Sequence, residues 1–334
     1  MKALKITGYG NLVNHLEFQN CPLPVVHQND VLIEVHAASI NPIDYKTVKG
    51  AARIISKLHF PAPIGFDVSG VIVDKGSTVT QFKLGDEVFA RVGGDRPGTL
   101  AELIAVDASF IALKPTSVSH EEAASIPLVG LTTLQAFQMA GLKAGQKVLI
   151  HAGSGGIGSF AVQLAKNIGA EVYTTTSTKN VEWVKALGAD RVFDYKTENY
   201  LDEISEVDFI YDTIGGEHTR NAFKIVKSGG AVINLTGPVI DRQSQIELGL
   251  SPLLRPVFAV MGLGIKSSIR KKKALYRFFL MEPNGAQLHQ IAKLMEDGKI
   301  KAIIDSVYPF DKAIDALLYL ELGHARGKVI VKVK

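Results

Sequence analysis

The clearest chemical signal in the sequence is a glycine-rich loop with the spacing G-x-G-x-x-G. It follows an apolar run from Lys147 that is typical of a strand, and it opens the stretch Ile157 to Asn167, which predicts a helix. The first glycine of such a loop permits a tight turn, the second lets the backbone approach a pyrophosphate, and the third lets helix and strand pack closely. Three glycines alone also occur in plain turns, but this context predicts a dinucleotide-binding loop. Its members are Gly153, Ser154, Gly155, Gly156, Ile157 and Gly158.

The residues at the end of the next predicted strand indicate which dinucleotide binds. An NAD site usually places Asp or Glu about 20 residues further on, where the carboxylate binds the ribose 2′-hydroxyl. The stretch Tyr173 to Lys179 has no acid. Thr176 and Ser177 offer hydroxyls and Lys179 a cation, which suit a 2′-phosphate that a carboxylate would repel. We predict NADPH rather than NADH; the alternative is a solvated loop that binds nothing.

The elements around this loop alternate between strand and helix from Lys147 onward. The runs VLI and VDFIY are apolar at successive positions, as strands buried on both faces should be. Helices are predicted over Ile157 to Asn167, Asn180 to Leu187 and Thr219 to Val226, with further strands between and after them. This alternation predicts an α/β fold with a doubly wound parallel sheet, a Rossmann domain.

The first part of the chain has a different character. From Met1 to about Lys114 it reads as many short strands with no helices between them, which suggests a small barrel. Ser119 is a plausible helix N-cap, because Glu122 follows at capping-box spacing. After about Pro283 the pattern predicts helices over Ala286 to Met295 and around Ile314 to Leu322, and a final strand, KVIVKV.

Several further motifs, taken in order, are specific together although each is weak alone. Together with the glycine loop, the chain resembles the zinc-free quinone oxidoreductase branch of the medium-chain dehydrogenase/reductase superfamily, the branch of zeta-crystallin. The matching pieces are Asn41-Pro-Ile-Asp44, Gly65-Phe-Asp67-Val-Ser-Gly70, Phe82 to Phe89, Ala123 to Pro127, Gly130-Leu-Thr132, Asp194-Tyr195 and Gly323 to Lys328.

The resemblance implies a domain plan. A GroES-like, barrel-type catalytic domain is expected over residues 1–122, a Rossmann NADPH-binding domain over 123–282, and a return to the catalytic domain over 283–334. The active site of such a protein is expected in the cleft between the two domains. A homodimer is also implied, joined through the edge strand Tyr276 to Met281, since an apolar edge strand is a liability unless paired.

The resemblance also implies that no metal takes part. Zinc-dependent relatives carry a cysteine near the position of Asn41 and Gly-His-Glu where this chain has Gly65-Phe-Asp67. The single cysteine, Cys21, lies in an unrelated Pro-rich stretch. We therefore expect no metal site, and hydride delivery to an acceptor that needs no Lewis acid, such as a quinone or a conjugated enone.

Individual roles follow from the resemblance. Asn41 and Thr132 are expected beside the nicotinamide, and Tyr195 and Lys179 at the 2′-phosphate end. Lys328 is expected to close over the cofactor from the returning segment. Further cofactor contacts are expected where two sheet strands end, as is usual for open α/β sheets, at Asp212, Thr236 and Gly237.

The proton donor is left open by the sequence. Tyr45 follows the Asn41 motif and is the candidate acid, with a plain pocket wall as the alternative interpretation. Asp44 is interpreted as a structural hydrogen-bond acceptor rather than a general acid. His151 is interpreted as a core histidine, since it ends a buried strand.

The composition limits the class of protein, its partners and its cellular location. The 334 residues are 46% hydrophobic and 21% charged, with a net charge of +4, which suits an ordinary globular protein of two domains and gives no strong nucleic-acid signal. The basic run Ile265 to Lys273 is interpreted as a solvated loop, with an acidic partner as the alternative. The stretch Leu250 to Ile265 is too short and too polar for a bilayer span. One cysteine and no signal-peptide pattern at the start predict a soluble, cytoplasmic protein.

The leading functional prediction is an NADPH-dependent, zinc-independent quinone oxidoreductase with a small-molecule substrate and neither nucleic acid nor membrane as partner. Two alternatives remain open. One is an NADPH-dependent reductase of enone or alkenal double bonds, which also needs a proton for the carbon next to the carbonyl. The other is a non-catalytic, crystallin-like NADPH-binding protein.

Overall fold

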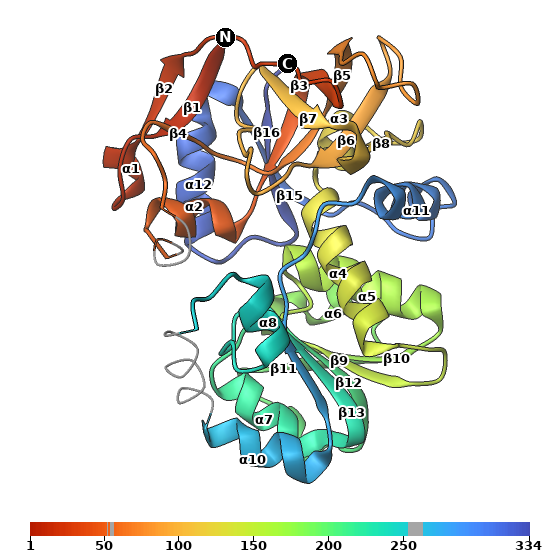
Figure 1. The fold of residues 1–334 in the computed structure, drawn as a ribbon. Helices are drawn as coiled ribbons and strands as arrows, with labels where there is room; N and C mark the ends of the chain where they lie inside the picture. Colours follow the sequence, from red (N-terminus) through yellow and green to blue (C-terminus); the bar gives the residue numbers. More distant parts are fainter. Residues whose placement is uncertain (52, 54–56, 253–262) are drawn as a thin grey trace. The chain divides into compact units, whose positions relative to one another are not determined.

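The computed structural model describes residues 1–51, 53, 57–252 and 263–334 (Figure 1). The chain forms two units: unit 1 comprises Met1–Leu131 and Glu282–Lys334, and unit 2 comprises Thr132–Met281. The returning tail thus shares a unit with the N-terminal part. The first boundary follows Leu131 instead of residue 122, because the helix that links the units starts in unit 1.

Unit 2 is built on a six-stranded parallel sheet with the order β11-β10-β9-β12-β13-β14. Because β9, the first strand in sequence, is central, the chain winds outward in both directions, which confirms the predicted doubly wound sheet. Central strands are buried on both faces, in keeping with their unbroken apolar runs. The strands are β9 (Lys147–Ile150), β10 (Glu171–Thr176), β11 (Arg191–Asp194), β12 (Val207–Asp212), β13 (Val226–Asn234) and β14 (Leu275–Phe278).

Helices flank this sheet on both faces (Figure 1). The predicted helices are present with ends close to those expected, and α5 ends at Gly169, whose φ of 89° is the left-handed conformation that favours glycine. The basic run was wrongly interpreted as a loop, because it lies largely within helix α10. Ile265 and Ile269, four residues apart, pack on the unit 2 core and hold that helix in place. The helices are α4 (Pro127–Ala140, entering from unit 1), α5 (Gly156–Ile168), α6 (Val181–Ala186), α7 (Glu217–Ile225), α8 (Arg242–Glu247) and α10 (Leu263–Lys272), with 3-10 turns η2 (Thr178–Asn180) and η3 (Tyr200–Asp202).

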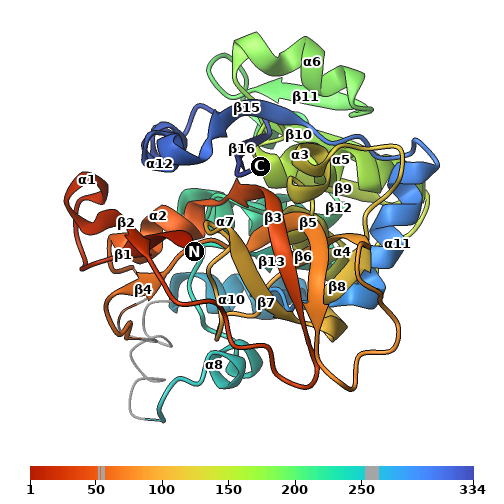
Figure 2. The ribbon, with the colours of Figure 1, turned by 90° about the horizontal axis from the view of Figure 1, so that it is seen from above.

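Unit 1 contains a seven-stranded sheet, with β15-β16-β3-β5-β6-β8 in order and β7 paired with β3, and a three-stranded sheet β2-β1-β4. Strands β3, β5 and β6 can be followed side by side in Figure 2. The strands are β1 (Lys2–Ile6), β2 (Leu16–Asn20), β3 (Asp30–Ile40), β4 (Ala62–Pro63), β5 (Asp67–Lys75), β6 (Glu87–Arg91), β7 (Leu103–Asp107), β8 (Ile111–Leu113), β15 (Ile304–Pro309) and β16 (Lys328–Lys332).

Helices interrupt these strands, so the expectation of strands alone up to Lys114 was wrong. Helix α2 begins directly after Asn41, because Pro42 has the φ that a first helical residue needs and Asp44 accepts from the Asn41 backbone N–H. The predicted capping box is confirmed, since Ser119 and Glu122 exchange hydrogen bonds of 2.8 and 3.1 Å. The helices are α1 (Leu12–His15), α2 (Pro42–Val48), α3 (His120–Ala124), α11 (Gly285–Glu296) and α12 (Ala313–Glu321), with 3-10 turns η1 (Ala108–Phe110) and η4 (Phe310–Lys312).

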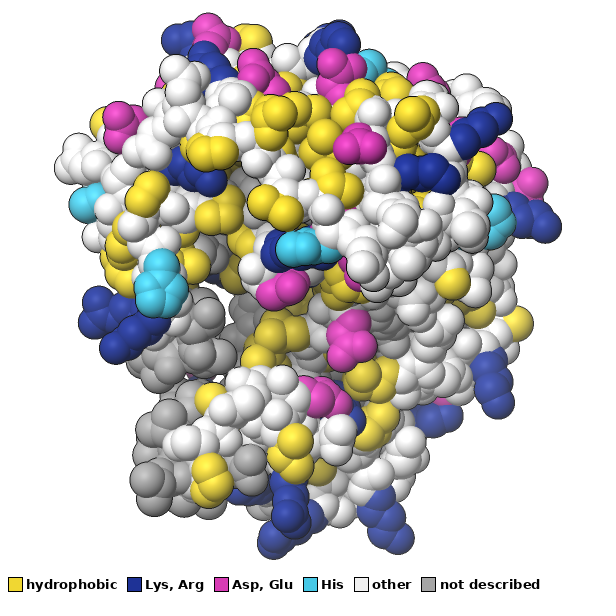
Figure 3. Space-filling view, turned by 45° about the horizontal axis from the view of Figure 1, so that its top comes forward, with side chains coloured by type: hydrophobic (Ala, Val, Ile, Leu, Met, Phe, Trp, Pro, Cys, Tyr) yellow, Lys and Arg dark blue, Asp and Glu magenta, His cyan; other side chains and the backbone are white. Residues whose placement is uncertain are grey.

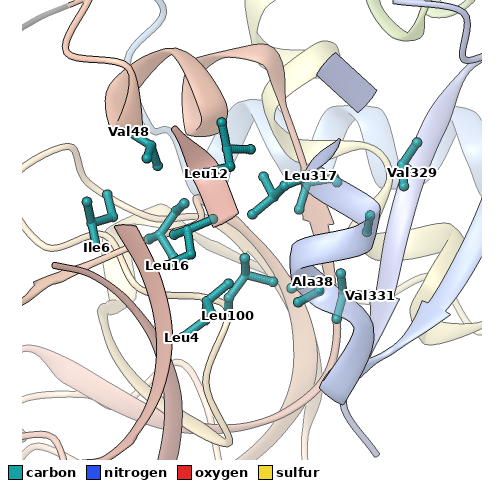
Figure 4. Close-up of a cluster of buried hydrophobic side chains, with 14 of the residues drawn as sticks. Leu4, Ile6, Leu12, Leu16, Ala38, Val48, Leu100, Leu317, Val329 and Val331 are labelled. Carbon is teal, nitrogen blue, oxygen red and sulfur yellow. The ribbon is translucent and has the colours of Figure 1, made fainter. Parts of the chain in front are cut away.

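The returning tail is held by a shared hydrophobic core. Strand β16 pairs antiparallel with β3, and α12 packs on α1 and α2. Figure 4 shows Leu317, Val329 and Val331 from the tail in one cluster of buried side chains with Leu4 and Leu100 from the N-terminal part. Burial of these side chains fixes the start of β16, and so fixes Lys328 beside the end of β3.

Candidate functional site

The glycine loop joins β9 to α5, with Gly155 as the residue before the first helical position. A Cβ on Gly158 would lie 2.1 Å from the carbonyl oxygen of Ala152, and one on Gly153 would lie 2.3 Å from Thr174 Oγ1. A Cβ on Gly155 would meet only the Ala152 carbonyl oxygen, at 3.5 Å. Two of the glycines are therefore required by the packing of the loop, whereas Gly155 faces open space.

This open space suits a phosphate group. The first N–H groups of α5 have no partners within the helix, and a helix N-terminus favours negative charge. Thr176 is only 2% exposed, and its hydroxyl donates to Ser154 Oγ at 2.9 Å. Thr176 therefore orients Ser154 in the loop, and Gly155 lets a ligand approach the backbone. The residues of the loop fit a dinucleotide pyrophosphate.

The end of β10 carries the groups expected for a 2′-phosphate. Lys179 is exposed in the turn η2, and Tyr195 is 61% exposed. The Tyr195 N–H donates to the Thr176 carbonyl at 3.0 Å, which brings Tyr195 beside the end of β10. Ser177 is half-buried and accepts from Asn180 Nδ2 at 3.2 Å. These side chains are brought together at the carboxyl ends of two neighbouring strands.

One carboxylate, Asp194, lies near this cluster at the end of β11. It is 6% exposed and accepts from the Lys196 N–H at 3.1 Å. The hydrogen bond from Thr178 is the main cause that lowers the pKa of Asp194. Its acceptor capacity is used within the protein.

A second polar cluster of unit 2 is completely buried at the ends of β9, β12 and β13. Asp212 Oδ1 lies 3.1 Å from His151 Nδ1 and accepts from the Gly215 N–H at 2.9 Å. Its Oδ2 accepts from Thr219 and Asn234, both at 2.5 Å. Burial alone would raise the pKa of Asp212, but these donors outweigh it and lower the pKa to about 2. His151 is a core residue, as interpreted, and the Asp212 carboxylate holds protein groups together.

The loop after β13 is shaped by the same cluster. Asn234 Oδ1 accepts from the backbone N–H groups of Thr236, at 2.7 Å, and Gly237. Thr236 and Gly237 line a cavity of about 330 Å³ in unit 2, which Arg220 also borders. The expected cofactor residues of this loop are therefore accessible, whereas Asp212 is not.

In unit 1 the structure brings Asn41, Asp67 and Lys328 together, all of them buried. Asn41 Nδ2 donates to Asp67 Oδ2 at 2.9 Å, and the Lys328 ammonium donates to Asn41 Oδ1. Lys328 Nζ also lies 3.3 Å from the Ile40 carbonyl oxygen and 3.6 Å from Asp67 Oδ2. Both polar atoms of the Asn41 side chain are thus fixed by charged neighbours.

The charges of Lys328 and Asp67 in this cluster depend on each other. Burial lowers the pKa of Lys328 and raises that of Asp67, and their mutual attraction opposes both effects. Asp67 also accepts from the Leu128 N–H at 2.8 Å. Arg91 lies close by, with its guanidinium 4.8 Å from the centre of the Phe66 ring. Lys328, expected over the cofactor, here holds Asn41 in place.

Thr132 and Tyr45 are placed differently. Thr132 is 5% exposed in α4, on the unit 2 side of the boundary. Tyr45 is half-buried and packs against the unit 1 core, and burial raises the pKa of its phenol. A higher pKa makes the phenol a weaker acid, and the role of Tyr45 stays a prediction.

The charged cluster was not anticipated from the sequence, apart from Asn41 and Lys328 taken singly. The sequence marks this cluster only weakly, by an acid as the first residue of the apolar strand β5 and a lysine as the first residue of the apolar strand β16. Buried charges are rare unless paired, so each of these residues needed a partner.

The described residues contain no group of three or more His, Cys, Asp or Glu side chains placed to hold a metal ion. Within the same residues no helix is both long and apolar enough to cross a bilayer; of the stretch Leu250 to Ile265, positions 253–262 lie outside the described residues. On the face shown in Figure 3, basic and acidic side chains are interspersed.

Comparison with known proteins gives matches along the whole chain. Residues 27–116 match the alcohol dehydrogenase GroES-like domain, and residues 187–331 match the zinc-binding dehydrogenase family. The chain is 36% identical over 340 residues to a chloroplast envelope quinone oxidoreductase homolog of Arabidopsis thaliana, covering 99% of this chain and 98% of that protein. It is also 36% identical over 342 residues to a 2-methylene-furan-3-one reductase of Solanum lycopersicum, covering 99% and 79%. The solved structure of the quinone oxidoreductase from Coxiella burnetii matches with a TM-score of 0.87 and 34% identity, covering 100% of this chain and 99% of that one.

Proposed function

Because the chain belongs to the quinone oxidoreductase branch of the medium-chain dehydrogenase/reductase superfamily, we propose that it reduces quinones with NADPH. The observation that carries this proposal is the glycine loop, where Gly155 faces open space at the start of α5. The choice of NADPH is supported by the end of β10, which offers Ser177 and Lys179 and no acid.

NADPH, when bound, supplies a hydride. The N-terminus of α5 and Ser154 would hold its pyrophosphate, and Ser177 and Lys179 its 2′-phosphate, with Tyr195 packed nearby. Thr236 and Gly237 offer backbone groups at the carboxyl end of β13. Asn41 is held in one orientation by Asp67 and Lys328, so its side chain needs no reorganisation when a ligand arrives.

The proposed reaction uses no zinc. Where zinc-dependent relatives are expected to have a cysteine thiolate, the chain has Asn41, and both polar atoms of that side chain are engaged with Asp67 and Lys328. The His of the Gly-His-Glu pattern is replaced by Phe66, which cannot ligate a metal. Exhaustive chelation should leave activity intact, and a tightly bound zinc that turnover requires would contradict this part of the proposal.

A second candidate reaction is the reduction of enone double bonds, supported by the similarity to a 2-methylene-furan-3-one reductase. The test of both is the consumption of NADPH over a panel of quinones, enones and alkenals, with the products identified. A quinol supports the first reaction and a saturated ketone the second. Tight NADPH binding with no oxidation across the panel would instead favour a non-catalytic binding protein.

We also propose a homodimer. In the described part of the sheet, β14 is a terminal strand, and Leu275 is 41% and Leu280 58% exposed at or just after it. Pairing β14 with its copy across a two-fold axis would cover these side chains. Light scattering at micromolar concentration should give twice the monomer mass, and a monomer would overturn the proposal.

A further inference from the structure

Two histidines of unit 1 that are distant in the sequence lie ring against ring. His36 belongs to β3 and His120 is the first residue of α3, and their ring centroids are 4.3 Å apart with an interplanar angle of 50°. Their side chains are 25% and 14% exposed. The Nε2 atoms of both rings are buried and have no hydrogen-bond partner among the described residues. The two imidazoles are therefore close enough for a charge on one to oppose a charge on the other.

A hydrogen bond to β5 decides which nitrogen of His120 carries a hydrogen. Ser69 Oγ donates its single proton to the Val88 carbonyl oxygen at 3.0 Å. Ser69 Oγ also lies 2.8 Å from His120 Nδ1, so the hydroxyl accepts there and Nδ1 carries the hydrogen. Nε2 of the neutral ring is then unprotonated. A further proton on His120 therefore goes to Nε2 and gives the ring a full positive charge.

The carboxylates closest to the two rings are already paired with lysines. Glu87 of β6 has one oxygen 3.5 Å from His120 Nε2 and the other 3.1 Å from the buried Lys114 Nζ. Glu34 of β3 lies 3.6 Å from His36 Nε2. The remaining charged groups around the pair are Lys334, 2.7 Å from Glu34, Lys332, 3.0 Å from Glu121, and Glu122, which accepts from the Ser119 N–H at 2.8 Å.

Histidine is the residue type in this cluster whose ordinary pKa lies between pH 5 and pH 8. The hydrogen bond from Lys334 lowers the pKa of Glu34, and the hydrogen bond from Lys114 lowers the pKa of Glu87. Burial raises the pKa of Glu121, but its hydrogen bonds outweigh burial and the pKa is lowered overall. These three carboxylates therefore stay charged between pH 7 and pH 5, while the histidines titrate.

The docked position of α3 disfavours a charge on His120. Burial is the main cause that lowers the pKa of His120, His36 lowers it further, and Glu87 opposes both. When α3 leaves the sheet, His120 is solvated and its pKa returns to the ordinary value of 6.5. The released helix then binds a proton more readily than the docked helix. Docking is therefore favoured above pH 6.5 and weakens as the pH falls below that value.

Helix α3 is short and depends on its packing against the sheet. It spans five residues, packs on β3, β5, β6 and β16, and buries Ala123 and Ala124. A single short helix has little stability of its own. The next helix along the chain, α4, carries the chain from unit 1 into unit 2. A change in the docking of α3 therefore acts directly on the segment that joins the two units.

We propose that His36 and His120 form an acid-sensitive clamp, which holds α3 on the sheet while His120 is neutral and releases α3 when acid charges both rings. Two like charges in contact oppose each other's protonation, so the two rings take up protons in coupled steps. The clamp acts within unit 1 and is independent of the proposed reaction.

The coupling of the two rings can be measured by NMR titration of protein labelled with ¹³C at histidine. The His120 signal, assigned by its absence in His120→Asn, should titrate below the ordinary value of 6.5. In His36→Gln, which removes the second charge, the midpoint of His120 should rise by about one pH unit. His289→Gln, at an exposed histidine of α11, is the matched control and should leave the midpoint unchanged. A His120 midpoint that does not move in His36→Gln would overturn the coupling.

The release of α3 can be measured by hydrogen exchange at pH 7 and pH 5. The amides of Ala123 and Ser125 donate within the α3 segment, and their protection factors should fall by up to about tenfold at pH 5, because one pKa unit is a factor of ten. The fall should be smaller in His36→Gln and absent in His120→Asn. Either variant removes the pair, so one that folds is enough. Unchanged protection of α3 at pH 5 in wild type, or an equal loss in β5 that marks unfolding of the whole unit, would overturn the clamp.

Discussion

Two aspartates, one in each unit, are equally buried and yet opposite in character. Asp44 in unit 1 and Asp212 in unit 2 are both 0% exposed. Asp212 accepts hydrogen bonds on both oxygens, from His151 and Thr219 among others, and its pKa falls to about 2. Asp44 accepts one, from the Asn41 backbone, and its pKa rises to about 7. Burial alone therefore does not set the charge of a carboxyl; the hydrogen-bond donors and the charges around it decide how far the effect of burial is offset.

The difference separates a buried carboxyl whose two oxygens both accept hydrogen bonds from one that has an oxygen without a partner among the described residues. Asp212 accepts from the Gly215 backbone N–H and from side chains of helix α7 and strand β13, and its Oδ1 lies beside His151 Nδ1, so both of its oxygens are engaged. Asp44 has one oxygen, Oδ1, that is buried and has no hydrogen-bond partner among the described residues. The glycine loop and the end of β10 likewise each contain one residue that is engaged within the protein and one that is open. The following experiments compare the two residues of each pair.

Removal of the satisfied carboxylate should have the largest effect. Asp212→Ala leaves Asn234, Thr219 and His151 without their buried acceptor, and breaking a buried charged network costs about 3–5 kcal/mol of unfolding free energy. Urea unfolding followed by the fluorescence of Trp183, the single tryptophan, reports on unit 2. Asp74→Ala at an exposed position should change this free energy by less than about 0.5 kcal/mol.

The pH dependence of this effect has a definite sign. Because the pKa of folded Asp212 lies below its ordinary value of 3.8, its stabilisation is present above that value and is lost as the pH falls toward 2. The gap between wild type and Asp212→Ala should therefore narrow below about pH 4. A gap that is constant from pH 7 to pH 3 would show that the carboxylate charge is not what matters.

The unsatisfied carboxyl should behave in the opposite way. Because the pKa of folded Asp44 lies above its ordinary value of 3.8, stability is fully present below that value and is lost as the pH rises toward 7. Asp44→Asn carries no charge, so it should match wild type at pH 4 and exceed it at pH 8. The upper bound of the gain is about 4 kcal/mol, at about 1.4 kcal/mol for each pKa unit. Calorimetry at both pH values checks this, and a variant less stable than wild type at pH 8 would refute it.

The sequence was sufficient wherever the signal is local. The ends of α5 were predicted to within a residue, since its apolar periodicity and Gly169 mark them directly. The Ser119 cap was predicted because a capping box spans only four positions. The doubly wound parallel sheet of unit 2 was predicted from the alternation of strand and helix. The glycine loop was recognised for the same reason, since its residues are contiguous.

The charged cluster could not be predicted in this way, because its partners are distant in sequence. Lys328 and Asn41 are separated by 287 positions, and only the pairing of β16 with β3 brings them together. Helix α2 was missed because seven residues between strands give too little periodicity to detect. Whether Asp44 is neutral depends on what surrounds it from β5, β6 and β16, so spacing along α2 contains no information about its charge.

Within the glycine loop, the space that a Cβ would need is occupied at Gly158 and free at Gly155. Gly158→Ala places a Cβ 2.1 Å from the Ala152 carbonyl oxygen and should destabilise the protein by about 1–3 kcal/mol. Gly155→Ala has room for its Cβ at a φ of −79°, so the melting temperature should hardly change. It should nevertheless weaken NADPH binding at least tenfold, equal to about 1.4 kcal/mol, because the methyl group occupies the approach of the pyrophosphate. Normal NADPH binding by Gly155→Ala would remove the loop from the cofactor site.

The smallest expected effect concerns the end of β10, where Thr176 is engaged with Ser154 and Lys179 is exposed. A charge-assisted hydrogen bond to phosphate contributes on the order of 1.5–3 kcal/mol. Lys179→Ala should therefore weaken NADPH binding by roughly tenfold or more and leave NADH binding nearly unchanged, because NADH has no 2′-phosphate. Ser177→Asp should reverse the preference, since its carboxylate repels the phosphate and accepts from the ribose hydroxyl.

Lys196→Ala, at another exposed lysine after β11, is the matched control for a general loss of positive charge. The measurement is the dissociation constant of NADPH and of NADH for wild type and for each of the three variants, which tests the preference for NADPH. Equal affinity of the wild type for NADH and NADPH would overturn the assignment, and so would a Lys179→Ala variant that loses both nucleotides alike.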